Sequence, residues 1–162
     1  MLEARSGVDV IYRPYKPADF DELYAIEEIC FQPPMRFPRR YIRRLVESDD
    51  VVTWIAEEDA RIAGFSIADF GVEADTLFAY IQTIEVRPEM RGRGAGNQLL
   101  RRIEESAREK GARAIWLHVE SGNGGAIRLY ESHGYRCEGR QEDYYARGRA
   151  GLVYRKLLEG ES

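Results

Sequence analysis

The chain has 162 residues, of which 44% are hydrophobic and 32% are charged. This length and balance predict one globular domain, residues 1–162, with a core large enough to fold without disulfides or a structural metal. The formal charge of -4 argues against a general nucleic-acid-binding protein, because such domains are normally basic.

Strand-like and helix-like segments alternate from the start of the sequence. Residues 9–13 predict a short strand, and a helix opened by Pro17 follows. The proline-rich segment 32–38 ends this helix, because adjacent prolines cannot continue one. A second helix is expected over residues 39–48. The residues expected to face inward on the two helices are Phe20, Leu23, Ile26, Ile29, Cys30, Tyr41, Leu45 and Val46.

Three β-rich runs follow at residues 51–58, 61–70 and 76–86, and the short gap between the first two suggests a hairpin. The clearest helix spans residues 96–111 and ends at Gly111 as a C-terminal cap. Its apolar face consists of Leu99, Leu100, Ile103 and Ala107. The remaining sequence predicts a glycine-rich loop at 121–125 between further elements, namely a strand at 114–120, a helix at 126–133 and strands at 135–145 and 151–158.

The order β α α β β β α β α β β predicts an α/β fold with a mixed central sheet of about seven strands and helices on both faces. The crossover from the strand at 76–86 to the strand at 114–120 requires those two strands to be parallel. No run approaches the roughly 20 apolar residues of a membrane span, and residues 1–17 lack the layout of a signal peptide. A cytoplasmic location without a membrane partner is therefore expected.

The cysteines and histidines argue against two further kinds of site. Cys30 and Cys137 lie far apart and no close set of cysteines and histidines exists, so we expect neither a disulfide nor a metal site. Both cysteines are expected to be buried free thiols. His133, which precedes Gly134 at a helix end, is expected to serve helix capping.

The stretch "VRPEMRGRGAGNQLL" at 86–100 places three glycines before the clearest helix. A helix N-terminus leaves backbone N–H groups without partners and attracts phosphate, while Arg91 and Arg93 add positive charge. Spacing excludes a dinucleotide fingerprint, because Asn97 stands where a glycine is required, and no Gly-Lys pair fits a P-loop. A glycine-rich turn with exposed arginines is the remaining alternative to a phosphate site.

Two motifs resemble one known family. Arg91, Gly94 and Gly96 reproduce the RxxGxG signature of the GNAT family of N-acetyltransferases. The stretch "LHVESGNGGAIRLYESHGY" at 117–135 resembles a conserved block of the N-terminal acetyltransferase subgroup, which includes the bacterial ribosomal-protein alanine acetyltransferases. The resemblance implies acetyl-CoA as the cofactor, released as coenzyme A. It implies cofactor contacts at Ile84, Glu85, Val86, Arg91, Gly92, Arg93, Gly94, Ala95, Gly96, Asn123 and Tyr130.

The resemblance also implies direct attack of a neutral amine on the thioester. Tyr130 would then protonate the leaving thiolate, and the N–H of Val86 is the candidate donor to the developing oxyanion. A terminal α-amine has a pKa of about 8, against about 10.4 for lysine, so neutralising it at pH 7 costs about 3 kcal/mol less. A weak base suffices for an α-amine. The alternative for Tyr130 is an aromatic side chain packed in the core.

His118 looks like the histidine of archaeal and eukaryotic members of the subgroup, and Tyr80 falls where some of them place a tyrosine that acts with it through a water. Simple alternation puts Tyr80 on one face of its strand with Gln82, Ile84 and Val86, and Glu85 on the other face. This arrangement favours Tyr80 over Glu85 as a base. Both His118 and Tyr80 could instead be ordinary core residues.

The substrate end is also assigned by resemblance. The loop at 33–37 and the tyrosines at 143–145 would cover a bound peptide N-terminus, with contacts from Phe31, Pro34, Met35, Phe37, Tyr144 and Tyr145. Aromatic side chains beside prolines could also simply pack the loop. Relatives often carry an acidic segment after the paired tyrosines, whereas residues 146–151, "ARGRAG", are basic, which leaves the peptide preference open.

The sequence therefore predicts an acetyl-CoA-dependent N-acetyltransferase that acts on the α-amine of a protein or peptide, such as a ribosomal protein, as a monomer or weak homodimer. One alternative is the same chemistry on a small-molecule or lysine amine. Another is a non-catalytic acyl-CoA-binding module. RNA binding through the single "RGRG" motif has little support in an acidic chain.

Overall fold

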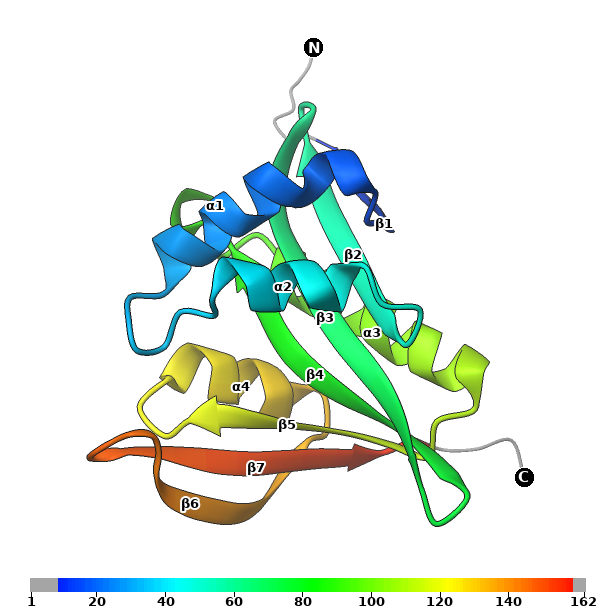
Figure 1. Cartoon of the computed structure of the whole chain (residues 1–162), viewed down its shortest axis with the longest axis vertical. Helices are drawn as coiled ribbons and strands as arrows, with labels where there is room; N and C mark the ends of the chain where they lie inside the picture. The colour runs from blue at the N-terminus through cyan, green and yellow to red at the C-terminus, as the bar shows by residue number, and fades with distance from the viewer. Residues whose placement is uncertain (1–8, 159–162) are drawn as a thin grey trace.

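A computed structural model of the chain describes residues 9–158 (Figure 1). Its helices are α1 (Phe20–Cys30), α2 (Arg39–Val46), α3 (Ala95–Lys110) and α4 (Gly124–Ser132), with short 3-10 turns at Pro17–Asp19 and Pro88–Met90. Its strands are β1 (Val10–Pro14), β2 (Val51–Glu58), β3 (Arg61–Glu73), β4 (Thr76–Val86), β5 (Ala114–Glu120), β6 (Arg136–Ala146) and β7 (Arg149–Leu157). The predicted order of elements is confirmed. Within the described range, no helix has both the length and the apolar character needed to cross a bilayer.

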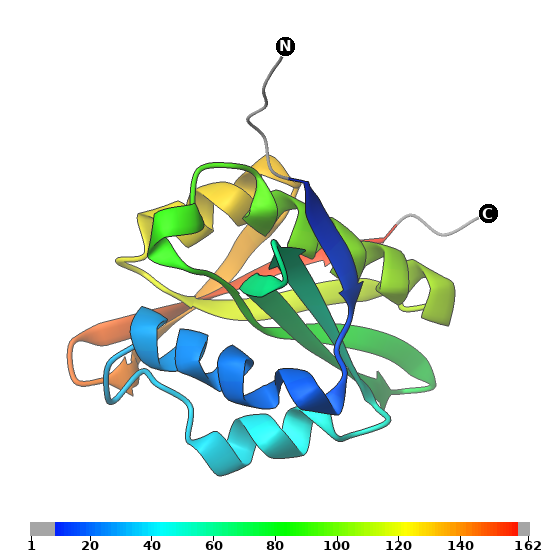
Figure 2. The same cartoon turned by 90° about the horizontal axis from the view of Figure 1, so that it is seen from above.

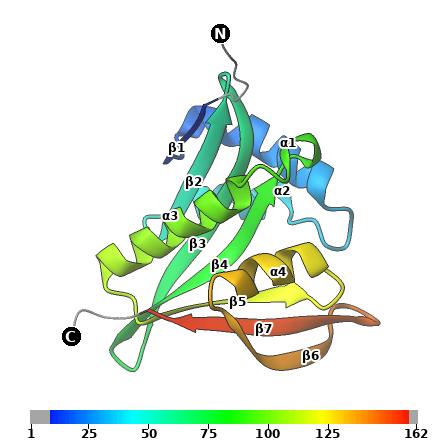
Figure 3. The same cartoon turned by 180° about the vertical axis from the view of Figure 1, so that it is seen from behind.

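The seven strands form one mixed sheet in the order β1-β2-β3-β4-β5-β7-β6. Among the strands of residues 9–158, only β4 and β5 pair in parallel, and helix α3 connects them, as the predicted crossover requires. Their pairing runs from Phe78 opposite Ala114 to Ile81 opposite Leu117. Beyond these residues the two strands diverge, which Figure 3 shows from behind.

Helices cover both faces of the sheet, as predicted. Figure 2 shows α1 and α2 on one side and α3 and α4 on the other. On the first side Phe20, Leu23 and Ile26 of α1 pack with Ile42 of α2 against the sheet. On the other side the expected apolar face of α3 is buried: Leu99, Leu100, Ile103 and Ala107 are all fully inaccessible. Burial of these two helical faces holds the diverging strands in place from both sides.

Three burial expectations, for Ile29, Cys137 and Cys30, are wrong. Ile29 is 49% exposed, because α1 turns it to solvent in its last turn. Tyr41, Leu45 and Val46 face inward as expected and pack, partly buried, against the core, although Ile42 is the fully buried residue of α2. Cys137 is exposed on β6, which lies at the edge of the sheet, and Cys30 is half-buried. Both cysteines are free thiols, as expected.

A β-bulge interrupts the alternation of β4. Ile67 of β3 pairs with Thr83, but the next residue, Ala68, pairs with Ile81, so Gln82 is an extra residue. Alternation had predicted Ile84 and Val86 on the same face as Tyr80. The bulge reverses the faces beyond Gln82, so Ile84 and Val86 pack with Leu99 of α3. Glu85 instead turns toward α1, on the face that carries Tyr80.

Candidate active site

Strands β4 and β5 separate at their C-terminal ends, and backbone amides of β4 face the opening. The N–H of Arg87 donates to the carbonyl of Ala63 at 2.8 Å. Arg87 and, two residues earlier, Glu85 therefore direct their N–H groups toward β3. The N–H groups of Ile84 and Val86 point to the opposite edge, where β5 has turned away. An extended ligand could pair with this edge as an added strand.

The glycine-rich turn before α3 forms a concave backbone surface beside this opening. Gly92 and Gly94 have φ angles of 79° and 88°, and a Cβ on either would meet nothing within 4 Å. Glycine is therefore required for the left-handed conformation rather than for space. Gly94 is the N-cap of α3, whose first turn carries no acidic side chain. The free N–H groups of this turn can receive an anion.

The side chains of the two arginines in this turn have different partners. The Nε of Arg91 donates to the carbonyl of Val86 at 2.9 Å, which ties the turn to the end of β4. Arg93 instead lies 3.4 Å from the carboxylate of Glu58 on β2. Glu58 is buried and requires a cation, so Arg93 faces away from the concave surface. The side chain of Arg93 therefore does not line the concave surface, and a contact between Arg93 and the cofactor stays a prediction.

Two cavities meet in the opening between the strands. The first, here called the nest cavity, has a volume of about 730 Å³. It is lined by Cys30, Phe31, Ile84, Glu85, Val86, Arg91, Gly92, Gly94, Ala95, Gly96, Asn97, Asn123, Gly125, Ala126, Arg128, Leu129 and Tyr130. With the exception of Arg93, every residue expected to contact the cofactor is in this set.

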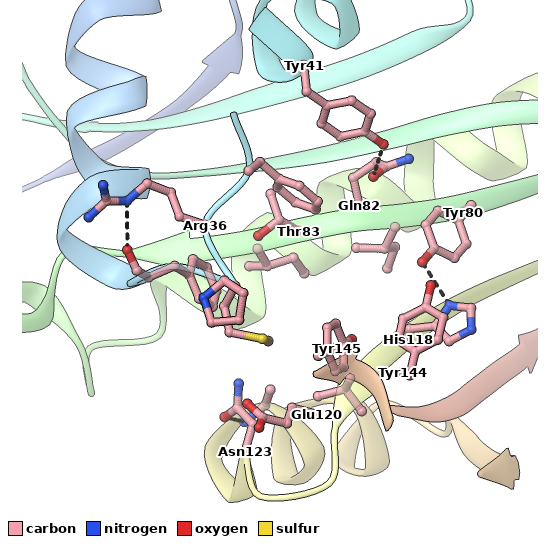
Figure 4. Close-up of a pocket in the computed structure, with 18 of the residues that line it drawn as sticks. Arg36, Tyr41, Tyr80, Gln82, Thr83, His118, Glu120, Asn123, Tyr144 and Tyr145 are labelled. Atoms are coloured by element: carbon pink, nitrogen blue, oxygen red, sulfur yellow. Dashed lines mark hydrogen bonds between the residues drawn. The ribbon is translucent and has the colours of Figure 1, made fainter. Parts of the chain in front are cut away.

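The second, here called the tyrosine cavity, has a volume of about 720 Å³ and lies between the α1–α2 loop and the β6–β7 hairpin (Figure 4). It is lined by Phe31, Pro34, Met35, Arg36, Phe37, Pro38, Tyr41, Tyr80, Ile81, Gln82, Thr83, Ile84, His118, Val119, Glu120, Asn123, Ala126, Tyr130, Tyr144 and Tyr145. The structure thus brings together all six residues predicted at the substrate end and all three predicted catalytic residues. The two cavities share Phe31, Ile84, Asn123, Ala126 and Tyr130.

Tyr130 lies where the two cavities meet, and this meeting point is here called the passage. Its side chain is only 6% exposed and packs edge-to-face on Tyr135, with ring centroids 5.6 Å apart. A buried tyrosine normally satisfies its hydroxyl with a partner. Among residues 9–158, no hydrogen bond to this hydroxyl is formed, whereas Tyr135 donates to Glu104 at 2.9 Å. Burial raises the pKa of Tyr130, so its hydroxyl keeps its proton and can donate it into the passage.

His118 and Tyr80 form a hydrogen-bonded pair on the wall of the tyrosine cavity (Figure 4). The Nε2 of His118 lies 2.7 Å from the side-chain oxygen Oε1 of Gln141, which can only accept, so this nitrogen carries the proton. The Nδ1 then accepts from the hydroxyl of Tyr80 at 2.9 Å. The ring of Tyr144 stacks on His118 at 4.2 Å. Burial lowers the pKa of His118 more than the bond to Gln141 raises it, so His118 is neutral at pH 7.

Sequence reasoning missed a second polar chain beside this pair. The hydroxyl of Tyr41 donates to Gln82 at 2.9 Å, and the amide of Gln82 donates to Asp69 at 3.0 Å. No motif marks Gln82, because its position depends on the bulge. Gln141, which sets the tautomer of His118, is equally unmarked. Arg128 of α4 was also missed, although a basic residue five positions after the loop residue Asn123 is a readable signal for an anion site.

Two other predicted residues have structural tasks as well. Asn123 lines both cavities and is the N-cap of α4, where its side chain accepts from the N–H of Ala126 at 3.1 Å. His133 is the C-cap residue of α4, as expected, and its Nε2 lies 2.8 Å from the side-chain oxygen of Asn97. His133 therefore braces α4 against the first turn of α3.

A buried pair of carboxyl groups lies beneath the passage. Glu27 of α1 is fully inaccessible and Glu85 of β4 is 3% exposed. One oxygen of Glu27 accepts from the N–H of Phe37 at 2.9 Å, and one oxygen of Glu85 accepts from Thr83 at 2.8 Å. Burial foremost, and hydrogen bonding to Glu27 next, raise the pKa of Glu85 well above its usual value. Glu85 is therefore the protonated member. The second oxygen of each carboxyl group is buried without another partner among the described residues, so a proton shared between Glu85 and Glu27 would join the α1–α2 loop to the end of β4.

This pair predicts a distinctive pH dependence of stability. Native Glu85 keeps a proton that the unfolded chain loses near its ordinary pKa of about 4.3, so stability falls as the pH rises above that value. We expect wild type to lose up to about 1.4 kcal/mol per pH unit relative to Glu85→Gln, until native Glu85 also ionises. Urea unfolding of both proteins between about pH 4.5 and pH 8 measures the difference. Parallel curves would contradict the shared proton. The matched variant Glu105→Gln, on the exposed side of α3, is expected to follow wild type.

Comparison with known proteins agrees with this geometry. A sequence model of the acetyltransferase (GNAT) family matches residues 20–135. A Bacillus subtilis protein provisionally named ribosomal protein bS18-alanine N-acetyltransferase is 32% identical over 127 residues, which is 78% of this chain and 81% of that protein. The histone acetyltransferase MCC1 of Arabidopsis thaliana is 27% identical over 157 residues, which is 83% of this chain and 63% of that protein.

Among solved structures, Arabidopsis thaliana NAA60 in complex with acetyl-CoA superimposes with a TM-score of 0.84 at 23% identity, covering 94% of this chain and 100% of that one. This likeness shows a shared fold. The family match spans β4, the glycine-rich turn, α3, β5 and Tyr130, which are the parts that build the passage. The chain therefore belongs to the acetyltransferase (GNAT) family.

Proposed function

We propose that this GNAT acetyltransferase transfers an acetyl group from acetyl-CoA to the N-terminal α-amine of a protein or peptide, with residues 1–162 acting as one domain. The observation that carries the proposal is the junction of two cavities at Tyr130. The nest cavity has the features of an anion site. The tyrosine cavity has an apolar rim and contains the hydrogen-bonded pair of Tyr80 and His118, which can accept a proton. Ligands in the two cavities would meet at Tyr130, the one buried tyrosine whose hydroxyl has no partner within the described residues.

The nest cavity fits coenzyme A. Its glycine turn and the free amides of α3 suit a diphosphate, and Arg91 and Arg128 add two guanidinium groups. The outward N–H groups of Ile84 and Val86 suit the amide-bearing pantetheine arm. Bound there, acetyl-CoA supplies an acetyl thioester as the acyl donor. We assign Val86 N–H as the donor to the carbonyl oxygen of the reacting group and Tyr130 as the proton donor to the leaving sulfur.

The proton released by the amine goes to the pair of Tyr80 and His118. His118 is neutral and its Nδ1 is an acceptor, so it can take the Tyr80 proton while Tyr80 takes one from the amine, directly or through a water. This base is weak. It suits an α-amine, which is about 3 kcal/mol easier to neutralise at pH 7 than lysine. Glu120, the carboxylate on the cavity wall, is held by Arg149 at 2.9 Å and is a poor competitor as base.

The names of both relatives point to protein acceptors. The Bacillus protein is named for an alanine of ribosomal protein bS18 and the Arabidopsis protein for histones. Because His118 is a weak base, we favour an α-amine over a lysine amine as the acceptor. The similarity to the Bacillus subtilis protein supports a ribosomal protein as one of the acceptors. The apolar rim of Phe31, Met35 and Phe37 would cover the first side chains. We place the reaction in the cytoplasm, with the protein as a monomer or weak homodimer.

Steady-state turnover of acetyl-CoA tests the proposal. We expect activity with peptides that carry a free α-amine, and at least about 100-fold less with the same peptides when the α-amine is blocked and a lysine is left free. Small amines are expected to be poor acceptors, because they leave the apolar rim empty. Equal activity on blocked and free peptides, or activity on small amines alone, would overturn the proposal.

A further inference from the structure

A third hollow, here called the hairpin groove, lies beside the tyrosine cavity and has a volume of about 510 Å³. It is lined by two carboxylates and four Phe, Tyr or Trp side chains, together with a glycine, a valine and a histidine: Asp69, Glu73, Phe78, Tyr80, Trp116, Tyr144, Gly71, Val72 and His118. Tyr80, with His118 and Tyr144, also lines the tyrosine cavity, so the two hollows are continuous. The proposed function uses the nest cavity and the tyrosine cavity, and it assigns no role to the hairpin groove.

The pairing register shows why these side chains share one face. Asp69 pairs with Tyr80 and Gly71 pairs with Phe78 across β3 and β4, and Tyr80 pairs with Trp116 across β4 and β5. Helix α2 packs on β2 and β3, and Figure 1 shows the β3–β4 hairpin extending beyond both α1 and α2. A Cβ added to Gly71 would meet nothing within 4 Å, so the floor of the groove is open.

The groove has the composition of a cation site. Carboxylates attract a positive side chain, and aromatic faces attract it further through their negative π surfaces. Within residues 9–158, neither Lys nor Arg lines the groove, so no described cation competes for it there. The carboxylate of Asp69 is held in place by the amide of Gln82 at 3.0 Å. The two carboxylates would repel an acidic segment.

Distance along β4 places the groove within reach of a bound peptide. Tyr80 precedes Ile84 by four residues and Thr76, opposite Glu73, precedes it by eight. At about 3.3 Å per residue these offsets are roughly 13 and 26 Å. An extended peptide whose α-amine lies near Ile84 and Tyr130 would therefore reach the hairpin groove about four to eight residues after its N-terminus.

We infer that the hairpin groove binds a Lys or Arg side chain located about four to eight residues after the N-terminus of the acceptor, and so selects basic N-terminal segments. This inference rests on the proposed transfer to a peptide α-amine. A second copy of the chain is the other occupant that the experiment distinguishes.

Turnover is compared for two peptides that begin with alanine and differ only in Lys or Gln at residues five and six. We expect the KM of wild type to be about tenfold lower for the Lys peptide. The double variant Asp69→Asn/Glu73→Gln is expected to bring the ratio of the two KM values close to one. Gly71→Leu fills the groove without changing charge and is expected to have the same effect. Glu105→Gln, which removes a carboxylate from the opposite side of the molecule, is the matched control and should keep the preference.

Binding of a fluorescent, Nα-acetylated Lys peptide separates the groove from the reaction, because this peptide has no α-amine to react. We expect it to bind wild type about tenfold more tightly than the double variant. If the acetylated peptide binds wild type more tightly in this way but no peptide is turned over, the proposed function is wrong and the inference that the groove binds a basic side chain still holds. Equal KM values for the two peptides in wild type, or a preference for the Lys peptide that persists in Gly71→Leu, would contradict the inference that the groove binds a basic side chain. A dimer that Gly71→Leu abolishes, without peptide binding, would assign the groove to a second copy and overturn the inference too.

Discussion

Tyr130→Phe is expected to lower kcat by about 10² to 10⁴-fold, because the leaving sulfur loses its proton donor. The same change should alter the free energy of unfolding by less than about 0.5 kcal/mol, since no described residue bonds to the hydroxyl that is removed. Binding of coenzyme A should change little. Stopped turnover assays, urea unfolding and calorimetry measure the three quantities on one preparation.

Tyr135→Phe is the matched control for this prediction. Tyr135 contacts Tyr130 and is equally buried, but its hydroxyl donates to Glu104 and lines neither cavity. Losing that bond should cost about 1–3 kcal/mol of stability and leave kcat nearly intact. The two variants should therefore show opposite patterns. If Tyr130→Phe retained wild-type kcat, the assignment of Tyr130 as proton donor would be wrong.

His118→Ala is expected to lower kcat by about 10² to 10⁴-fold and to change the pH profile. The base acts when neutral, so kcat of wild type should fall as the pH drops through the pKa of His118. Burial lowers that pKa, which places this acid limb below about pH 6.5. The variant should lack the limb. Tyr80→Phe should lower kcat as well, because it removes the hydroxyl that links the amine to Nδ1.

The second histidine of the chain provides the control. His133 bonds to Asn97 at the end of α4 and does not line the tyrosine cavity, so His133→Ala should keep the acid limb. The profile is measured as kcat at saturating acetyl-CoA and peptide between about pH 5 and pH 9. An acid limb that persists unchanged in His118→Ala would show that another group is the base.

Most of the fold could be predicted from local patterns. Helix α3 was readable because its apolar residues recur at helical spacing between a glycine turn and Gly111, and that face is fully buried. The parallel pairing of β4 and β5 followed from the crossover rule. The exposed Ile29 was not readable, since its spacing fits the apolar stripe and only the arrangement of α1 on the sheet leaves it in solvent.

The site residues that lie in recognisable sequence motifs could be predicted. Those whose position depends on the pairing of distant segments could not. Gly94 and Tyr130 lie in recognisable motifs and line the passage. The bulge at Gln82 leaves no signature in sequence, and it reverses the predicted faces of Ile84, Val86 and Glu85. As a result Glu85 meets Glu27 beneath the passage rather than lying on the far side of the sheet. The contact of the Arg93 side chain with Glu58 could not be predicted, because the two residues are distant in sequence.

The central claim is that a thioester bound through the glycine turn meets a peptide α-amine at Tyr130. Calorimetric titration with two conjugates tests it most directly: coenzyme A joined through an acetyl bridge to the α-nitrogen of a peptide, and the same conjugate joined through a lysine ε-nitrogen. The first should bind at least about 100-fold more tightly than coenzyme A alone, because it fills both cavities at once. The second should bind about as tightly as coenzyme A. An α-linked conjugate that binds no better than coenzyme A would contradict the account.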